Sequence, residues 1–281
     1  MIIDSHIHFG NSAWGNYSPE EVLAILGENI DYAICSNLEG IDSPEFKKEF
    51  ECNSAMLNIA QKYSKIKPLY VCQPNQDVEI KDVRDFLIKN SEFVGLKFHP
   101  ECMKLPADNV KYDKYLHLAE ELNLPCLYHS GHIKSRFSSP KLIYRKAQEF
   151  PNVSFVLGHL STGPRESHLE AIDILLESIE TSSATLYVDV SWLDFAYEKL
   201  NETYEETLYL INALKYTAKG DYTHRILWAS DAPVGRFNQS PESYLKNLRI
   251  FQEKVLEKFN DKMLLNNLLF NNAKRLYGIE F

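Results

Sequence analysis

Eight short apolar segments alternate with longer segments of helical character along the 281 residues of the chain. Their lengths and their β-branched or aromatic content are typical of strands, and several are apolar throughout, like strands covered on both faces. Eight strand–helix units predict an α/β fold with a parallel sheet, and their number favours a (β/α)8 TIM barrel over an open doubly wound sheet. The segments are MIIDSHIH (1–8), DYAICSN (31–37), IKPLYVCQP (66–74), FVGLKFHP (93–100), PCLYHSG (125–131), VSFVLGH (153–159), TLYVDVS (185–191) and RILWASD (225–231).

Several segments between the predicted strands begin with helix start signals. Ser18 precedes a proline and is followed three residues later by Glu21, which is the pattern of a capping box. Ser43, Ser139 and Ser240 also stand directly before a proline. No glycine- or serine-rich linker interrupts the alternation, so residues 1–281 are expected to form a single barrel domain.

The composition argues against several classes of protein. The 30 Lys and Arg residues against 39 Asp and Glu residues give a formal charge of −9, which disfavours nucleic-acid binding. No apolar run reaches the roughly 18 residues that suggest a membrane span, and the N-terminus lacks the pattern of a signal peptide. The five cysteines show no CxxC spacing, which is typical of buried thiols in a reducing compartment. We therefore expect a cytoplasmic protein with no membrane or nucleic-acid partner.

Polar side chains occur where the predicted strands end. They are His6 and His8 on the first strand, Lys97 and His99 on the fourth, His129 on the fifth, His159 on the sixth and Asp231 on the eighth. In a barrel, the carboxyl ends of all strands open on one face. Because residues i and i+2 of a strand point to the same side, His6 and His8 can face the interior together. Several imidazoles and one carboxylate at that face predict a site for a divalent transition metal.

The same segments, in this order, resemble the amidohydrolase superfamily. The motifs are DSHIH at the first strand, GLKFHP at the fourth, LYHSG at the fifth, VLGH at the sixth and ILWASDAP at the eighth. They are most similar to its amidohydrolase-related branch, which includes aminocarboxymuconate-semialdehyde decarboxylase and related hydrolases, and the similarity extends to the terminal NNAKRLYGI.

The resemblance implies a metal centre with defined ligands. His6, His8, His129 and Asp231 would bind the metal, and His159 would lie near the metal-bound water or on a second ion. The centre would therefore hold one or two ions. Zinc is the favoured ion, with manganese, iron and nickel as alternatives.

Four further residues are candidates for substrate binding. Lys97 would bind an anionic substrate group or pair with a carboxylate, although some branches of the superfamily use a carboxylated lysine here to bridge two metals. His99 shares the parity of Lys97 and would either line the pocket or act structurally. His132, in the loop after the fifth strand, could contact the substrate. Arg236, after the eighth strand, would clamp a carboxylate or remain solvated.

The expected activity is metal-dependent hydrolysis of an amide, lactone or ester bond by a metal-activated water, in a small substrate that could bear a carboxylate. Asp231 would carry the proton from water to the leaving group, and His159 would stabilise the developing oxyanion. A non-oxidative decarboxylase of the same superfamily and a barrel that binds a metal or metabolite without turnover are the alternatives.

Two further expectations concern a related nuclease family and the subunit state. TatD-like nucleases share the early His-x-His, but GLKFHP lacks the acidic residue that they carry on the fourth strand, and the net charge argues further against them. Exposed helices around a barrel are compatible with a homo-oligomer.

Overall fold

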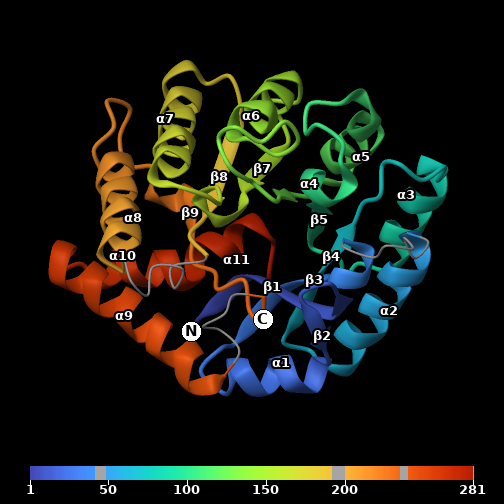
Figure 1. The fold of residues 1–281 in the computed structure, drawn as a ribbon, viewed down its shortest axis with the longest axis horizontal. Helices are drawn as coiled ribbons and strands as arrows, with labels where there is room; N and C mark the ends of the chain where they lie inside the picture. The colour runs from blue at the N-terminus through green and yellow to red at the C-terminus, as the bar shows by residue number, and fades with distance from the viewer. Residues whose placement is uncertain (42–48, 192–199, 235–239, 281) are drawn as a thin grey trace.

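The computed structural model describes residues 1–41, 49–191, 200–234 and 240–280, in which one sheet is surrounded by helices (Figure 1). The strand order is β2-β1-β3-β4-β5-β6-β7-β8-β9, and all neighbouring strands are parallel except β1 and β2. The strands are β1 (Ile3–Ser12), β2 (Gly15–Tyr17), β3 (Tyr32–Asn37), β4 (Ile66–Val71), β5 (Gly95–Phe98), β6 (Cys126–Tyr128), β7 (Ser154–Leu157), β8 (Thr185–Asp189) and β9 (Ile226–Leu227). β3 to β9 lie within the predicted segments, and β1 begins in the first segment but continues to Ser12; the hairpin that contains β2 was not predicted.

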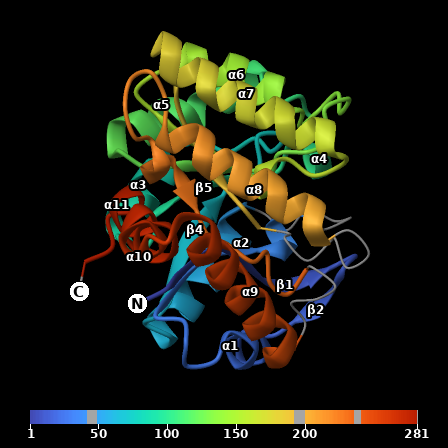
Figure 2. The same cartoon turned by 90° about the vertical axis from the view of Figure 1, so that its left-hand side faces the viewer.

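The longer helices form a ring outside the strands, as Figures 1 and 2 show from two directions. None of the helices in the described ranges is long and apolar enough to cross a membrane. The helices are α1 (Pro19–Leu26), α2 (Glu49–Lys62), α3 (Ile80–Lys89), α4 (Pro100–Met103), α5 (Asp113–Leu122), α6 (Pro140–Glu149), α7 (Arg165–Thr181), α8 (Leu200–Lys215), α9 (Pro241–Phe259), α10 (Lys262–Asn266) and α11 (Asn272–Leu276).

The serine–proline signals mark helix starts where the structure describes them. Ser18 and Glu21 form a complete capping box at the start of α1. Ser240 caps α9 together with Ser243. Ser139 precedes α6 without a hydrogen bond from its side chain, so Pro140 at the first helical position provides the start signal there. Ser43 lies outside the described residues.

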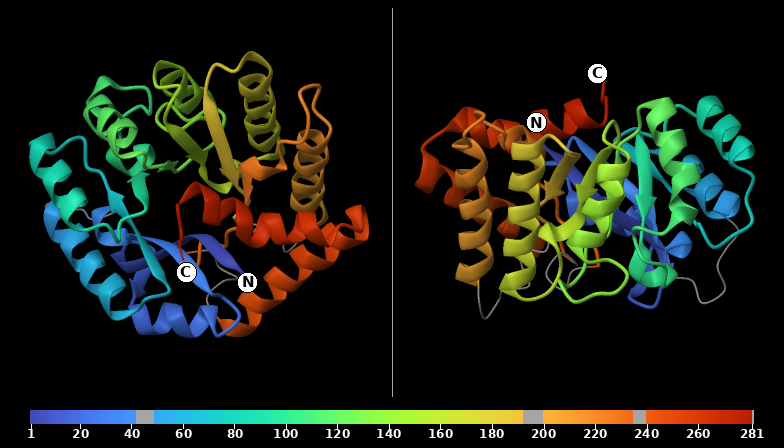
Figure 3. Two further views of the ribbon diagram at one scale, coloured as in Figure 1. Left: turned by 180° about the vertical axis from the view of Figure 1, so that it is seen from behind. Right: turned by 90° about the horizontal axis from the view of Figure 1, so that it is seen from above.

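The C-terminal helices cover one end of the strands, where α10 and α11 run across the sheet (Figure 3). An inner apolar cluster joins α11 and its flanking residues to the side chains that face inward from the strands. Its members are Ile3, Ile34, Leu69, Leu127, Val156 and Leu227 from the strands, and Phe270, Ala273, Tyr277 and Ile279 from the C-terminal segment. The interior is therefore packed at this end, which leaves the opposite, carboxyl end of the strands for polar side chains.

β1 also meets the segment that follows β9. Ile7 and Ala232 form an isolated parallel bridge. The backbone N–H of His8 donates to the carbonyl of Ala232 at 2.8 Å, and the N–H of Asp231 donates to the carbonyl of His6 at 2.9 Å. These bonds bring the first and last strands together, although no continuous ladder joins β1 and β9 in the described part of the chain. The α/β fold with a curled, TIM-barrel-like sheet is thus confirmed.

A register shift in β1 decides which of its side chains face inward. The pairing of β1 with β3 shifts between Asp4 and Ile7. Ile3 belongs to the inner cluster, whereas Ile7 packs in the core between the sheet and the helices. Strict alternation would put residues i and i+4 on the same side, so the shift reverses the alternation and turns His6 and His8 to the inside.

Gly95, where β5 begins, has no room for a side chain. A Cβ atom there would lie 2.7 Å from the carbonyl oxygen of Pro125 and 2.9 Å from Cδ2 of Leu69. Gly95→Ala is therefore expected to lower the free energy of unfolding by about 1–3 kcal/mol, because neighbouring backbone must move. Urea unfolding followed by circular dichroism measures the change. A stability equal to that of the wild type would show that the contact with Pro125 does not restrict this position.

Candidate active site

The residues predicted at the strand ends lie together at the carboxyl end of the sheet. His6 and His8 are on β1, and Lys97 is on β5. His129 follows β6, His159 lies in the 3₁₀ turn after β7, and Asp231 follows β9. His6 and Lys97 are each 1% exposed and Asp231 is 2% exposed, so these polar groups are buried among one another and away from water.

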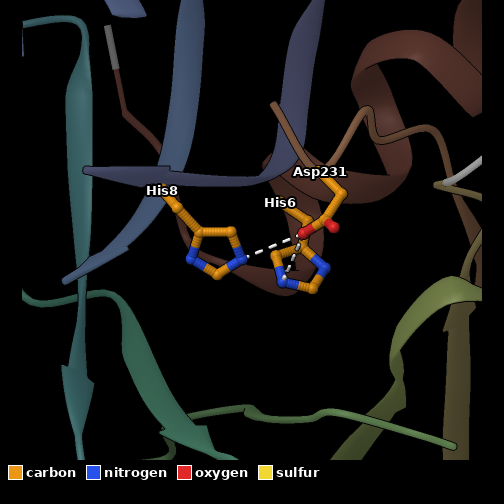
Figure 4. Close-up of side chains that lie close together, drawn as sticks. All are labelled: His6, His8 and Asp231. Atoms are coloured by element: carbon orange, nitrogen blue, oxygen red, sulfur yellow. Dashed lines mark hydrogen bonds and ion pairs between the residues drawn. The ribbon is translucent and has the colours of Figure 1, made fainter. Parts of the chain in front are cut away.

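The rings of His6 and His8 both approach the carboxylate of Asp231 (Figure 4). The distance from Asp231 Oδ1 is 2.9 Å to His8 Nε2 and 3.6 Å to His6 Nε2. One donor atom from each residue lies within 4.8 Å of the others, which is a spacing that could hold a metal ion. The first and the last strands of the chain thus supply one compact group of imidazole and carboxylate donors.

The second ring nitrogen of each of these histidines also has a partner. His6 Nδ1 lies 2.9 Å from Oδ2 of Asp189, at the end of β8. His8 Nδ1 lies 2.9 Å from the hydroxyl of Ser36, on β3. Such contacts fix the ring orientation and leave Nε2 of both rings directed towards Asp231.

His129 and His159 extend the cluster to β6 and β7. His129 Nδ1 lies 3.2 Å from Nε2 of His159, and His159 Nδ1 lies 2.7 Å from the hydroxyl of Ser191. His99 caps α4, where its Nδ1 accepts the N–H of Cys102, and its ring stacks on His129 with 4.1 Å between centroids. His129 is absent from the compact group formed by His6, His8 and Asp231, so its part in metal binding remains a prediction.

Lys97 is the buried cation of this cluster. Its Nζ lies 2.7 Å from Nε2 of His6. Burial lowers the pKa of Lys97 to about 8, although the carboxylates of Asp231 and Asp189 oppose this shift. Asp189 lies across the His6 ring from Lys97, on Nδ1, whereas Asp231 lies on the same side as Lys97, near Nε2 of His6.

The histidines of the cluster are held in the neutral form. Burial, together with the nearby charge of Lys97, lowers the pKa of His6 below its ordinary value. Burial likewise lowers the pKa values of His8, His99 and His129, and it lowers that of His159 to about 4. Neutral imidazole is the form that binds metal ions, so the rings need lose no proton at neutral pH.

The buried carboxylates have pKa values shifted in two directions: those in the cluster are lowered, and one behind it is raised. Burial by itself would raise the pKa of Asp231, but the imidazole of His159 and the hydrogen bond with His8 outweigh it and hold this pKa well below its usual range. The pKa of Asp189 is lowered in the same way, mainly by His6. Behind β1, burial raises the pKa of Asp4 to about 7 despite hydrogen bonds from Ser230 and other donors.

The two remaining predicted substrate-binding residues are His132 and Arg236. His132 is partly buried in the loop after β6, and its Nδ1 accepts the backbone N–H of Lys134. Arg236, the predicted carboxylate clamp, lies outside the described residues.

A cavity of about 580 Å³ lies among the β1–β2 hairpin, α1 and the residues that follow β9. Its lining includes Trp14 and Tyr17 from the β1–β2 hairpin, Ile25 from α1, and Pro233, which lies two residues after Asp231. The Trp14 ring is 6.2 Å from the ring of His99. The hairpin that the sequence did not predict therefore supplies an aromatic wall next to the polar cluster.

Three residues that contact the cluster were not singled out from the sequence. Asp189, Ser191 and Ser36 each hold a histidine ring or its backbone in place. Asp189 ends a predicted strand, so the rule that selected the other strand-end residues could also have selected it. The two serines carry no comparable signal, because hydroxyl groups at strand ends are common and make many different bonds.

The donor set fits a divalent transition metal. His6, His8 and Asp231 offer two neutral imidazoles and an ionised carboxylate, and both imidazoles have a second hydrogen-bonding partner. Zinc, manganese and iron accept such mixed nitrogen and oxygen donors. A buried lysine beside them supplies a positive charge that can face an anionic group.

Solved structures share the fold at low sequence identity. A probable 2-pyrone-4,6-dicarboxylic acid hydrolase from Acinetobacter baumannii with bound citric acid is 18% identical with a TM-score of 0.68, covering 99% of each chain. An amidohydrolase from Burkholderia multivorans with bound zinc is 11% identical with a TM-score of 0.67, covering 100% of each chain. A 5-carboxyvanillate decarboxylase mutant from Novosphingobium aromaticivorans, with bound manganese and a nitrobenzoic acid, is 12% identical with a TM-score of 0.63, covering 99% of this chain and 97% of that one.

A family model identifies the family of the chain, although the sequence identity to each of these solved structures is low. A search of curated proteins finds no match. In contrast, the family model described as "Amidohydrolase" matches residues 3–279, which include every polar residue of the cluster. The resemblance inferred from the strand-end motifs is thereby confirmed, and the chain belongs to the amidohydrolase family of enzymes.

Proposed function

We propose that this protein is a metal-dependent hydrolase that opens a lactone or ester bond in a small, ring-containing substrate. The observation that carries the proposal is the buried group of His6, His8 and Asp231, whose donor atoms lie within 4.8 Å of one another. The similar structures with bound zinc, manganese and citric acid support the choice of a metal ion and a small acidic ligand. Amide hydrolysis is the broader activity that the same groups would support.

We further propose that the fold is a complete (β/α)8 barrel, closed where β1 meets the segment after β9. In this barrel His6, His8 and Asp231 would hold one divalent ion, with His129 completing the set, and zinc is our first choice. When bound, the ion would polarise the scissile carbonyl and lower the pKa of a water molecule. We also propose that the protein is located in the cytoplasm.

The proton transfers are assigned to side chains of the chain itself. Asp231 would accept a proton from the attacking water as the new C–O bond forms, and would return it to the leaving oxygen as the old C–O bond breaks. Lys97 would face the negative charge that develops on the carbonyl oxygen or a carboxylate of the substrate. His159 would be a second group that can accept a proton near the reacting carbonyl.

The cavity next to the β1–β2 hairpin suits the ring of the proposed substrate. Its aromatic, aliphatic and proline side chains offer an apolar surface, Asn16 and Glu21 are its polar members, and Trp14 connects it to His99. His99 lies between Trp14 and His129 and would contact the substrate between the cavity and the cluster. Arg236 and His132 remain candidates for binding a more distant carboxylate.

Metal removal and product identification test the proposal together. Protein stripped with dipicolinic acid is expected to lose turnover of lactones, including carboxylated 2-pyrones and coumarin-type rings, and to regain it with zinc or manganese. Circular dichroism before and after stripping serves as the control for the fold. Turnover by protein that contains no metal would contradict the proposal.

Product analysis separates hydrolysis from its main alternative. Hydrolysis yields the ring-opened acid without gas, whereas a decarboxylase would release carbon dioxide from carboxylated phenols such as 5-carboxyvanillate. The structural similarity to a decarboxylase makes this second panel necessary. Carbon dioxide as the product would replace the proposed reaction by decarboxylation at the same residues.

A further inference from the structure

Asp189, at the end of β8, contacts two histidines and a serine. Its Oδ2 lies 2.9 Å from His6 Nδ1. Its Oδ1 accepts the backbone N–H of His159 at 2.8 Å and the hydroxyl of Ser191 at 2.6 Å. We propose that Asp189 is a positioning residue that sets the tautomers of His6 and His159 and so prepares Nε2 of His6 to bind a metal; the metal-binding part rests on the proposed function.

The tautomer of His6 follows from its two partners. A carboxylate can only accept hydrogen bonds, so the contact with Asp189 requires the proton of His6 to be on Nδ1. On the other side of the ring, Nε2 lies 2.7 Å from Nζ of Lys97, which has N–H groups to donate to it. Both contacts therefore assign the same neutral tautomer to His6, with the lone pair of Nε2 directed towards Lys97 and Asp231.

The tautomer of His159 follows through Ser191. A hydroxyl has a single proton, and the 2.6 Å contact with Asp189 Oδ1 requires Ser191 to donate it to the carboxylate. The oxygen of Ser191 must then accept a hydrogen bond from Nδ1–H of His159, at 2.7 Å. Nε2 of His159 is consequently an acceptor, and the 3.2 Å contact with His129 requires Nδ1–H of His129 to donate to it.

This chain of donors has a consequence for the reaction. A neutral His159 with its proton on Nδ1 cannot donate through Nε2 to a developing oxyanion, so it acts as a proton acceptor. Oxyanion stabilisation then falls to Lys97, whose Nζ is the donor that faces His6 Nε2. Nε2 of His129 keeps its lone pair, as metal binding requires.

Asp189 could instead be a ligand of a second ion, because its carboxylate lies within 4.8 Å of donor atoms of His6 and His159. The hydrogen bonds argue against this role. Oδ1 already accepts bonds from His159 and Ser191, and an ion at Oδ2 would have to displace the proton on His6 Nδ1. The network therefore favours one ion, bound on the side of Nε2.

Long-range ¹H–¹⁵N correlation spectra of histidine-labelled wild-type protein test the assignment directly. His6 and His159 are expected to be protonated on Nδ1 both without metal and with zinc. His8 provides an internal contrast: without metal its Nε2–H must donate to the carboxylate of Asp231 at 2.9 Å, whereas zinc on Nε2 is expected to move the proton to Nδ1, where the hydroxyl of Ser36 can accept it. Protonation of His6 on Nε2 in the metal-free protein would overturn the proposal.

Asp189→Asn is the matching variant. The amide oxygen can keep the bonds from His159 and Ser191, which turns the NH₂ group towards His6 Nδ1 and moves the His6 proton to Nε2. Zinc affinity, measured by competition with a chromogenic chelator, is expected to fall by about 10–100-fold. Ser191→Ala leaves the contact between Asp189 and His6 intact, so its zinc affinity is expected to change by less than about threefold.

Neither the histidine spectra nor the zinc affinity depends on a substrate. The role of Asp189 can therefore fail while the proposed hydrolase activity stands, and the reverse. Unchanged zinc affinity in Asp189→Asn, or a stoichiometry that falls from two ions to one, would overturn the positioning role. Thermal unfolding of the metal-free variants controls for a general loss of structure. If Asp189→Asn does not fold, the wild-type spectra alone decide the assignment.

Discussion

Replacing Asp231 with asparagine is expected to lower kcat by ~10²–10⁴-fold, the usual effect of losing a general acid–base group. Asparagine has nearly the same shape and keeps one oxygen for the contact with His8, at 2.9 Å in the wild type. It cannot, however, accept the proton of the attacking water. The measurement is steady-state kinetics on the best substrate of the lactone panel, at saturating zinc.

Two further measurements separate proton transfer from metal binding in this variant. Zinc content after dialysis shows how much affinity the carboxylate contributes, and KM shows whether the substrate still binds. Asp173→Asn, at an exposed position of α7, is the matched control and is expected to retain wild-type kcat. An Asp231→Asn enzyme that holds zinc and keeps more than a tenth of the wild-type kcat would remove Asp231 from the mechanism.

Replacing Glu49 with alanine is expected to lower the free energy of unfolding by ~2–5 kcal/mol, because each buried donor left without an acceptor costs about 1–3 kcal/mol. Glu49 begins α2 and is fully buried. Its Oε1 accepts the hydroxyl of Tyr70 at 2.8 Å, and its Oε2 accepts the hydroxyl of Tyr115 at 2.6 Å and the N–H of Gln73 at 2.8 Å. One carboxylate thus connects α2, β4 and its exit, and α5.

Urea unfolding measures this loss, and a neighbouring glutamate offers the matched control. Glu51 lies on the same helix but is exposed, so Glu51→Ala is expected to change stability by less than about 0.5 kcal/mol. Tyr115→Phe removes one donor and is expected to cost less than Glu49→Ala, since it leaves the other bonds of Glu49 in place. Equal stability of Glu49→Ala and Glu51→Ala would show that water replaces the lost acceptor.

The sequence predicted where the parallel strands lie along the chain. Buried strands are short runs of apolar residues, whereas the helices between them repeat apolar residues on one face only. The sequence also placed His6 and His8 on one side of β1, and both rings do approach Asp231. Simple alternation along β1 does not explain why this side faces inward. The register shift between Asp4 and Ile7 reverses which side of β1 faces the interior. A bulge of this kind has no local sequence signal, so periodicity cannot reveal it.

Residues that act through hydrogen bonds were harder to predict than the strand-end histidines. The position of Asp189 at a strand end is visible in the sequence, as it is for Asp231, but its partners are not. Its contacts with both His6 and His159, which are distant in sequence, are visible only in the structure. The β1–β2 hairpin was not predicted because its paired part is only three residues long on each strand and its turn lacks the Asn-Gly or Asp-Gly pair typical of tight hairpins.

The meeting of β1 with the segment after β9 has a consequence for the order of events during protein synthesis. His6 and His8 leave the ribosome early, whereas Asp231, 223 residues after His8, and the backbone groups that pair with β1 emerge much later. Until then one edge of β1 lacks its partner, and the proposed ligand group is incomplete. Stable binding of the proposed ion would therefore come late, after the growing chain has folded back so that the segment after β9 meets β1.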